Sequence, residues 1–364
     1  MKKAGIITHY NVHNHGAHLQ LYGLSCVLRN LGYEAKALQF QKNYDFMGGA
    51  STGDKYNISL KSIPVYAKYL IKNGASRTVY NYKKRKGLAA FRKKTDIVGA
   101  YYSEAKDLDV VVIGSDEIFS IEAGPNPWYY GIGVPCKKQI SYAASFGPTT
   151  MEMIEEHNMS SMISAGLASL KEIAVRDKNS SEIVKKLTSR EAKIVCDPVL
   201  LYDWKTEKNL DMKKRPINEK YCIVYSYDYN MNDTDTVNAI KKYAAKRNLK
   251  VVSLAYFHKW CDENVNVDPL DIFAWFANSE MVFTDTFHGS VLSLVTGAQF
   301  VAKIRGNGNK LSFLLDQYGV LERKVDDFSG IEEISHLPIN YEEVNKTIVS
   351  IRKESLDYLE KALG

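Results

Sequence analysis

The residues best suited to chemistry lie in loops that follow short apolar runs. The clearest loop spans residues 284–290, Thr-Asp-Thr-Phe-His-Gly-Ser, between an apolar run and a helical pattern. A histidine at the start of a helix can give or take a proton near neutral pH. The loop therefore predicts a general acid or base at His288, and a purely structural histidine is the alternative.

Cations follow two other apolar runs. Arg176 comes directly after the run 172–175, and the stretch 303–310, Lys-Ile-Arg-Gly-Asn-Gly-Asn-Lys, follows the run 299–304. An arginine at such a position can clamp a carboxylate or a phosphate with two hydrogen bonds. Glycines beside Arg305 and Lys310 suit an anionic ligand. The alternatives are a structural pair between Arg176 and Asp177, and a solvent-facing turn at 303–310.

Four histidines stand within residues 9–18, which invites a zinc interpretation. No cysteine or acidic residue accompanies them and their spacing crosses from a loop into a helix, so we expect no metal site. Gly16 allows a close backbone approach, and the positive end of the following helix favours an anion or a hydroxyl-bearing substrate. The segment predicts either substrate contact or an ordinary polar loop.

Two more polar clusters, at residues 114–117 and 145–147, also follow apolar runs. Each either caps the next helix or faces a ligand. The sequence holds no glycine-rich dinucleotide motif at its first strand, no P-loop and no nucleophile elbow, which disfavours a nicotinamide cofactor. These residues alone indicate an enzyme with a cleft for an anionic ligand.

The elements that must position these loops alternate between strand and helix. Apolar runs bounded by polar or glycine-containing turns are typical of buried parallel strands. The first half has such runs at 5–9, 108–113, 139–144, 172–175 and 193–196. After residue 220 the rhythm restarts, with strands expected at 221–227, 250–257, 281–285 and 299–304 and helices at 234–247, 269–278, 288–296 and 310–318.

Two successive α/β halves predict two Rossmann-like domains facing across a cleft, with ligands at the carboxyl ends of the strands. We place the N-terminal domain at 1–204, with a basic insertion at 40–105 that contains helices. A charged, proline-containing linker at 205–220 leads to the C-terminal domain at 221–335. Residues 336–364 carry a last helix, expected to pack back on the N-terminal domain.

Composition points to a cytoplasmic protein. The formal charge is +6, the five cysteines are scattered without a paired motif, and no run is long enough to cross a membrane. Much of the positive charge lies at 83–94, among aromatic residues. This segment predicts a solvated helix, with contact to an anionic membrane surface as the next interpretation. Nucleic acid is not expected, since no nucleic-acid module accompanies it.

The same loops resemble, in order, the motifs of the polysaccharide pyruvyl transferase family. Residues 14–20 are similar to its N-Y-G-A-x-L-Q segment, with His15 in place of the usual tyrosine, and residues 112–119 are similar to its V-I-G-S-D-Q-I-W. Further matches lie at 140–147, at 175–177 with Ser180 or Ser181, at 197–201 and at 284–291. Together they span nearly the whole chain, from residue 5 to about 320.

The resemblance implies a fold similar to GT-B glycosyltransferases, phosphoenolpyruvate as the donor, a sugar diol as the acceptor, and neither metal nor cofactor. His288 would then be the general acid. Some relatives have Arg-Leu-His at 286–288, so Thr286 removes a donor-binding cation that Arg305 or Lys310 would replace. The implied donor-binding residues are Arg176, Thr286, Phe287, Gly289, Ser290, Arg305 and Lys310. The implied acceptor-binding residues are Asn14, His15, Gln20, Ser115, Asp116, Ser145 and Phe146.

Two other functions remain open from the sequence. A GT-B glycosyltransferase would use the same fold and hold a nucleotide sugar through the basic loop at 303–310. A sugar-binding protein of a polysaccharide assembly system that has lost catalysis is the second alternative, and Thr286 is the residue that favours it. The family setting implies a polysaccharide or its lipid-linked precursor as acceptor, at the inner face of the membrane.

Overall fold

The computed structural model describes residues 1–40, 63–124, 126–208, 210–305 and 309–364. Its N-terminal sheet has the strand order β3-β2-β1-β4-β5, and all neighbouring strands are parallel. The strands are β1 (Lys2–Ile7), β2 (Tyr33–Gln39), β3 (Val98–Tyr101), β4 (Val110–Ile113) and β5 (Gln139–Ser141). A parallel pair, β6 (Ala174–Val175) and β7 (Lys193–Ile194), adjoins β5 through single bridges.

The C-terminal sheet is also parallel throughout and has the order β10-β9-β8-β11-β12-β13. Its strands are β8 (Tyr221–Tyr225), β9 (Lys250–Leu254), β10 (Glu263–Val265), β11 (Met281–Thr284), β12 (Phe300–Lys303) and β13 (Lys324–Val325). This is the strand order of a doubly wound nucleotide-binding fold, whose chain reversal opens a crevice beside the first strand. The first sheet has the same order over its five strands.

Helices cover both sheets because each presents one apolar stripe to the strands. In α1 (His15–Asn30) the apolar stripe includes Leu21, Leu24 and Leu28, each at 0% exposure. The other helices that flank the sheets are α3 (Met151–Glu156), α4 (Ser160–Ser169), α5 (Lys178–Thr188), α6 (Pro198–Leu201), α7 (Thr234–Lys246), α8 (Ile272–Ala277), α9 (Phe287–Thr296), α10 (Asn309–Gln317) and α11 (Ile331–Ser335).

The region expected as a basic insertion with helices, 40–105, does contain a helix. It contains α2 (Ile63–Thr95), which bends at Gly74, and β3, which is a strand of the N-terminal sheet. Residues 41–62 lie outside the described part. The strand β2 has no counterpart among the expected strands, because its residues alternate between buried and exposed and form no apolar run.

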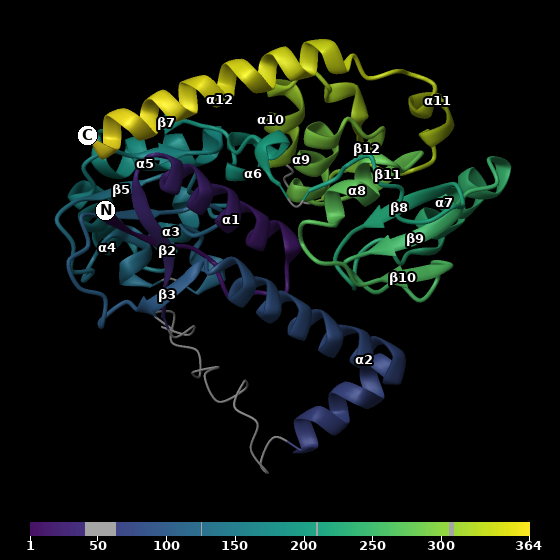
Figure 1. Ribbon diagram of the computed structural model, residues 1–364, viewed down its shortest axis with the longest axis horizontal. Helices are drawn as coiled ribbons and strands as arrows, with labels where there is room; N and C mark the ends of the chain where they lie inside the picture. The colour runs from purple at the N-terminus through teal and green to yellow at the C-terminus, as the bar shows by residue number, and fades with distance from the viewer. Residues whose placement is uncertain (41–62, 125, 209, 306–308) are drawn as a thin grey trace.

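The last helix, α12 (Tyr341–Leu363), runs over both domains, along the top of Figure 1. Near its end Lys138 donates to the carbonyl of Leu363 at 2.7 Å, and Tyr358 donates to the carbonyl of Ser141 at 2.9 Å. At its start the Tyr341 hydroxyl bonds a carbonyl of the C-terminal domain. The segment 205–220 holds the end of a short 3-10 turn (Trp204–Thr206) and otherwise no helix or strand in its described residues. In the described ranges, no helix combines the length and apolarity needed to cross a membrane.

Candidate active site

A cavity of about 520 Å³ opens between the two domains, at the carboxyl ends of their strands. The N-terminal domain lines it with His9, Asn14, Asp116, Glu117, Gly147, Pro148, Arg176, Asp177 and Asn179. The C-terminal domain contributes Tyr225, Tyr227, Tyr256, Asp285, Thr286, Phe287, His288, Arg305, Lys310 and Leu311. This is the place where open α/β folds bind ligands.

His288 reaches the cavity from the first turn of α9. The helix begins there because Thr286 caps it, its hydroxyl accepting from the backbone N–H of Gly289 at 3.0 Å. The ring is buried, and its Nε2 lies 3.8 Å from Oδ2 of Asp197 with no hydrogen-bond partner among the described residues. A histidine nitrogen that faces a cavity without a hydrogen bond can exchange a proton with a bound ligand.

Gly16, near the start of α1, lets the N-terminal domain approach this ring. A Cβ atom built at Gly16 would lie 2.3 Å from Cγ of His288 and 2.6 Å from its Nδ1. Only a residue without a side chain fits against the imidazole. The expected close approach at Gly16 is therefore made by a side chain of the opposite domain, and it fixes where His288 can lie.

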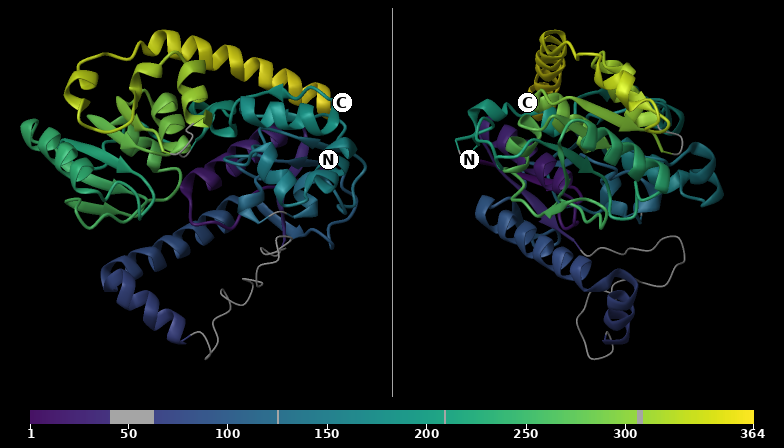
Figure 2. Two further views of the ribbon diagram at one scale, coloured as in Figure 1. Left: turned by 180° about the vertical axis from the view of Figure 1, so that it is seen from behind. Right: turned by 90° about the vertical axis from the view of Figure 1, so that its right-hand side faces the viewer.

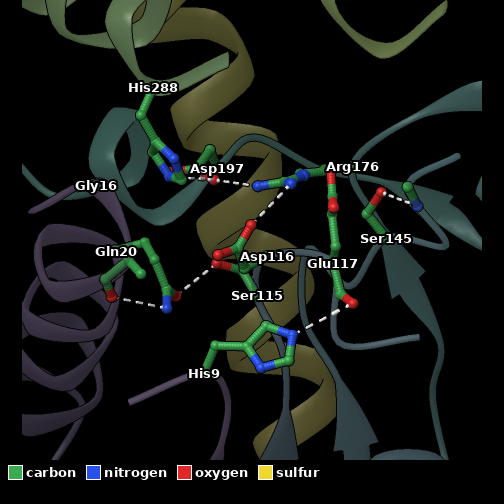
Figure 3. A network of polar contacts seen from close by, with 12 residues as sticks. His9, Gly16, Gln20, Ser115, Asp116, Glu117, Ser145, Arg176, Asp197 and His288 are labelled. Carbon is green, nitrogen blue, oxygen red and sulfur yellow. Dashed lines mark hydrogen bonds and ion pairs between the residues drawn. The ribbon is translucent and has the colours of Figure 1, made fainter. Parts of the chain in front are cut away.

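Arg176 is held between two carboxylates, as Figure 3 shows. Its Nη2 lies 3.1 Å from Oδ1 of Asp116 and its Nη1 lies 3.0 Å from Oδ2 of Asp197. The guanidinium also stacks on the ring of Phe287, 4.3 Å from the centroid, which is a cation–π contact between the domains. Its side chain is only 2% exposed. The partners of the guanidinium are Asp116 and Asp197, and the alternative pair of Arg176 with Asp177 is not formed.

The charges of this cluster support one another. Burial of the Asp116 carboxyl opposes its ionisation, but the charge of Arg176, with smaller contributions from neighbours such as His288, lowers the pKa of Asp116 to about 2. Burial also opposes the charge on Arg176, yet the two carboxylates raise the pKa of the guanidinium above its usual value. Both groups are therefore charged at neutral pH.

Two further cations face the cavity and each already has a carboxylate partner. Arg305 Nε lies 2.8 Å from Oδ2 of Asp285, and Lys310 is paired with Glu117 of the opposite domain. The Arg305 and Lys310 side chains are 46% and 33% exposed, far more than that of Arg176. Burial lowers the pKa of Lys310, which the charge of Asp116 partly offsets. Arg305 and Lys310 are thus the cations with ends accessible to a ligand.

Tyrosines form the opposite wall, and none of them was a predicted site residue. Asn14 donates to the Tyr227 hydroxyl at 3.2 Å and accepts from the Tyr256 hydroxyl at 3.4 Å, which joins the domains. The buried Tyr225 hydroxyl has no partner in the described part of the chain. Tyr225 ends β8, and Tyr227 and Tyr256 lie in the loops after β8 and β9. Ligands bind at the carboxyl ends of such strands, so the sequence could have indicated these tyrosines as well.

Several predicted acceptor residues lie behind the cavity wall and do not line it. Gln20 and Ser115 are buried and bonded to each other at 2.6 Å, and Ser145 donates to Asp177 at 2.6 Å. Phe146 packs in the core, and His15 bonds the carbonyl of Val267 at 3.0 Å. Gly289 and Ser290 are likewise inside α9 and absent from the lining. Within the predicted site, Asn14, Asp116, Arg176, Thr286, Phe287, His288, Arg305 and Lys310 line the cavity.

The histidines of residues 9–18 do not converge on one point. His18 bonds Arg92 through one ring nitrogen and the carbonyl of Asn14 through the other, at 2.8 Å each, and burial lowers its pKa to about 3. His9 bonds the carbonyl of Glu117 at 3.4 Å. Across the residues that the structure describes, no group of three or more histidine, cysteine or acidic side chains is arranged to hold a metal ion.

Comparison with known proteins adds the family. The model of the polysaccharide pyruvyl transferase family matches residues 14–305, which is most of the chain and includes every motif segment from 14–20 to 284–291. No curated protein sequence matches the chain.

Solved structures show the fold. The UDP-GlcNAc 2-epimerase of Methanocaldococcus jannaschii, solved with UDP-GlcNAc and UDP, is similar with a TM-score of 0.51 at 10% identity, over 97% of this chain and 100% of that one. The glycosyltransferase SnogD of Streptomyces nogalater gives 0.46 at 12% identity, over 100% and 99%. The expected fold of two Rossmann-like domains is confirmed by the two parallel sheets and by the likeness to the epimerase.

Proposed function

The chain belongs to the polysaccharide pyruvyl transferase family, and we propose that it moves a pyruvyl group from phosphoenolpyruvate onto a sugar diol. The observation that supports this most is the position of His288, a buried histidine without a hydrogen-bond partner on Nε2 among the described residues. It shares one cavity with Arg305 and Lys310, two cations that a small anion can reach. A proton donor beside cations is what an enol phosphate requires.

The proposed reaction needs one acid and charge compensation, without metal or cofactor. His288 gives a proton to the methylene carbon of phosphoenolpyruvate, and the neighbouring carbon takes up a sugar hydroxyl. The bond from that carbon to the phosphate oxygen then breaks, and a second hydroxyl closes the cyclic ketal. Two hydroxyl protons are lost, which balances the proton added to carbon and the one carried away by phosphate.

The ion pairs suggest different roles for Arg305, Lys310 and Arg176. Arg305 and Lys310 have partly exposed side chains, so we propose that they contact the donor's phosphate and carboxylate. On binding, these contacts would replace the ion pairs with Asp285 and Glu117. Both Nη atoms of Arg176 are occupied by aspartates. We therefore propose that Arg176 does not contact the donor directly and that its positive charge favours the anionic donor. Its contact with Phe287 would also hold the neighbouring His288 in place.

The acceptor is proposed to face the N-terminal side of the cavity. Asn14 and Asp116 line it there, and both can bond sugar hydroxyls. Tyr227 and Tyr256, across from them, present ring surface and hydroxyl groups of the kind that suits a pyranose. A polysaccharide or its lipid-linked precursor, met at the cytoplasmic face of a membrane, is the acceptor class that the family implies.

The test is direct synthesis. The purified protein is incubated with phosphoenolpyruvate and a panel of oligosaccharides and lipid-linked sugars, while free phosphate and the mass of each sugar are followed. We expect phosphate release only with both substrates, together with a ketal-bearing product. The His288→Asn variant, which keeps much of the size of the side chain and loses the acid, should turn over at least about a hundredfold more slowly. Sugar transfer from a nucleotide sugar, with no use of phosphoenolpyruvate, would contradict the proposal.

A further inference from the structure

The helix α2 carries an unusual charge. Its residues, Ile63–Thr95, include ten lysines and arginines and no acidic residue. Since the whole chain has a formal charge of +6, the rest of the molecule is negative by four charges. Ten like charges on one helix repel one another, so this concentration weakens the free helix. The exposed part of this charge is suited to a surface of opposite charge.

Part of this charge lies on one exposed face of α2, whereas Arg77, Lys84 and Arg92 contact the rest of the molecule. At 3.6 residues per turn, four exposed lysines, a tyrosine and a valine fall within about a third of the helix circumference. We call them the basic face: Val79, Tyr82, Lys83, Lys86, Lys93 and Lys94. Val79 and Tyr82 are 52% and 55% exposed. Within the described chain no carboxylate lies within 4 Å of these four lysines.

The opposite face of α2 is fixed to the molecule. Phe91 is buried in the core, the Tyr80 hydroxyl donates to the carbonyl of Val265 at 2.9 Å, and Lys84 lies over the ring of Tyr256 at 4.0 Å. The helix therefore spans from one domain to the other, and the basic face points outward. Figures 1 and 2 show α2 along the outside of the molecule, apart from the sheets.

From this arrangement we infer that the basic face docks the protein on an anionic lipid surface. Lysines attract acidic headgroups while their stems lie along the apolar boundary, and tyrosine favours the depth between headgroups and acyl chains. One exposed aromatic ring gives no platform for stacking successive bases, so nucleic acid fits less well. The inference stands independently of the proposed reaction. Because Tyr256 lines the cavity, docking through α2 brings the cavity beside the membrane.

The experiment uses the full chain and sedimentation with vesicles. One set contains phosphatidylcholine alone and the other phosphatidylcholine with phosphatidylglycerol, at low salt. We expect binding to the anionic set only, weakening as salt screens the charges. Replacing Lys83, Lys86 and Lys93 by glutamine should reduce binding by about fivefold for each charge. The Tyr82→Ala variant should reduce it further without changing the salt dependence.

The matched control removes the same number of exposed charges elsewhere. Lys241, Lys242 and Lys353 are exposed lysines outside α2, and their triple replacement by glutamine should leave vesicle binding unchanged. Circular dichroism and thermal unfolding establish that both triple variants are folded. The inference fails if the wild-type protein ignores anionic vesicles, if both triple variants lose binding equally, or if a DNA duplex binds in preference to the vesicles.

Discussion

At the scale of single residues, the cavity is a set of ion pairs shared between the domains. Asp197, at the start of α6, has one oxygen 3.0 Å from Arg176 and 3.8 Å from His288. Arg176 in turn stacks on Phe287, the residue before the histidine. His288 and Phe287 are thus positioned by charged groups of the opposite domain. Removing one member should affect the others.

Arg176 and Arg305 should respond differently to replacement by alanine. Without Arg176 the buried carboxylates of Asp116 and Asp197 lose their counter-charge, so we expect unfolding to become easier by about 3–5 kcal/mol. Without Arg305 the stability should change little, because its side chain is 46% exposed, while affinity for phosphoenolpyruvate should fall by about tenfold or more. Chemical denaturation and equilibrium binding measure the two effects, and the reverse pattern would assign the donor contact to Arg176.

Buried histidines predict a loss of stability in mild acid. Burial lowers the pKa of His18 to about 3 and that of His258 to about 4. A base with a depressed folded pKa contributes stability that is present above its unfolded value, near about 6.5, and is lost as pH falls toward the folded one. From about pH 7 to about pH 5, each should cost about 2 kcal/mol of unfolding free energy. The His258→Gln variant should show a fall smaller by that amount, and an equal fall in both proteins would contradict the assignment.

At the scale of elements, helix starts position the chemistry. The first residues of α1 and α9 meet in the cavity, each helix capped by the side chain before it, Asn14 and Thr286. The contact between Gly16 and His288 is the point where the two helices touch. The arrangement depends on the shape of one residue in α1 as much as on the acid itself.

Two glycines give a matched test of that contact. In Gly16→Ala the new methyl group would collide with the imidazole, so we expect His288 to be displaced and turnover to fall by about a hundredfold. At Gly87, in the exposed middle of α2, an added methyl group would meet no other atom within 4 Å. Gly87→Ala should therefore raise stability by about 0.5–1 kcal/mol with activity unchanged. Full activity of the Gly16 variant would show that the contact is unimportant.

At the scale of the whole molecule, α12 and α2 both connect the two domains, on different sides (Figure 2). The cavity depends on the relative placement of the domains, because its walls come from both. A helix that packs on both domains restricts how far they can separate. Loss of packing under α12 should therefore affect stability.

Substitutions at a buried and an exposed position of α12 distinguish the contribution of packing to stability from that of helix formation. Leu359 is fully buried, whereas Val349 is 62% exposed. Leu359→Ala should lower the free energy of unfolding by about 2–5 kcal/mol through loss of apolar contact and a cavity. Val349→Ala should change it by less than about 0.5 kcal/mol. Denaturant titration of the two variants decides whether α12 is a packed part of the fold, and similar small effects would contradict that.

The sequence predicted what depends on local pattern. Strands such as β4 and β8 are uniformly apolar because both faces are buried, and the cationic and histidine loops after strands line the cavity as expected. The alternating pattern of β2 escaped detection. Pairings between distant residues could not be predicted either, such as Arg176 with Asp197, which are brought together only by the fold.

Contacts between distant residues also explain why some predicted acceptor residues do not line the cavity. Gln20 and Ser115 have polar side chains beside a predicted ligand loop, yet they bond each other inside the wall. A residue's position in a motif does not say whether its side chain points into the cavity or away from it. The tyrosines were overlooked because an aromatic residue at a strand end is also a normal core residue.

We propose that the cavity takes phosphoenolpyruvate and no nucleotide sugar. Thermal unfolding with each ligand tests this without a known acceptor. A ligand at about 100 times its dissociation constant stabilises the folded state by roughly 2.7 kcal/mol, which is an easily measured shift. We predict such a shift with phosphoenolpyruvate, reduced in Arg305→Ala and Lys310→Ala, and none with a panel of nucleotide sugars. A shift with a nucleotide sugar alone would contradict the account and assign the same cations to a sugar diphosphate.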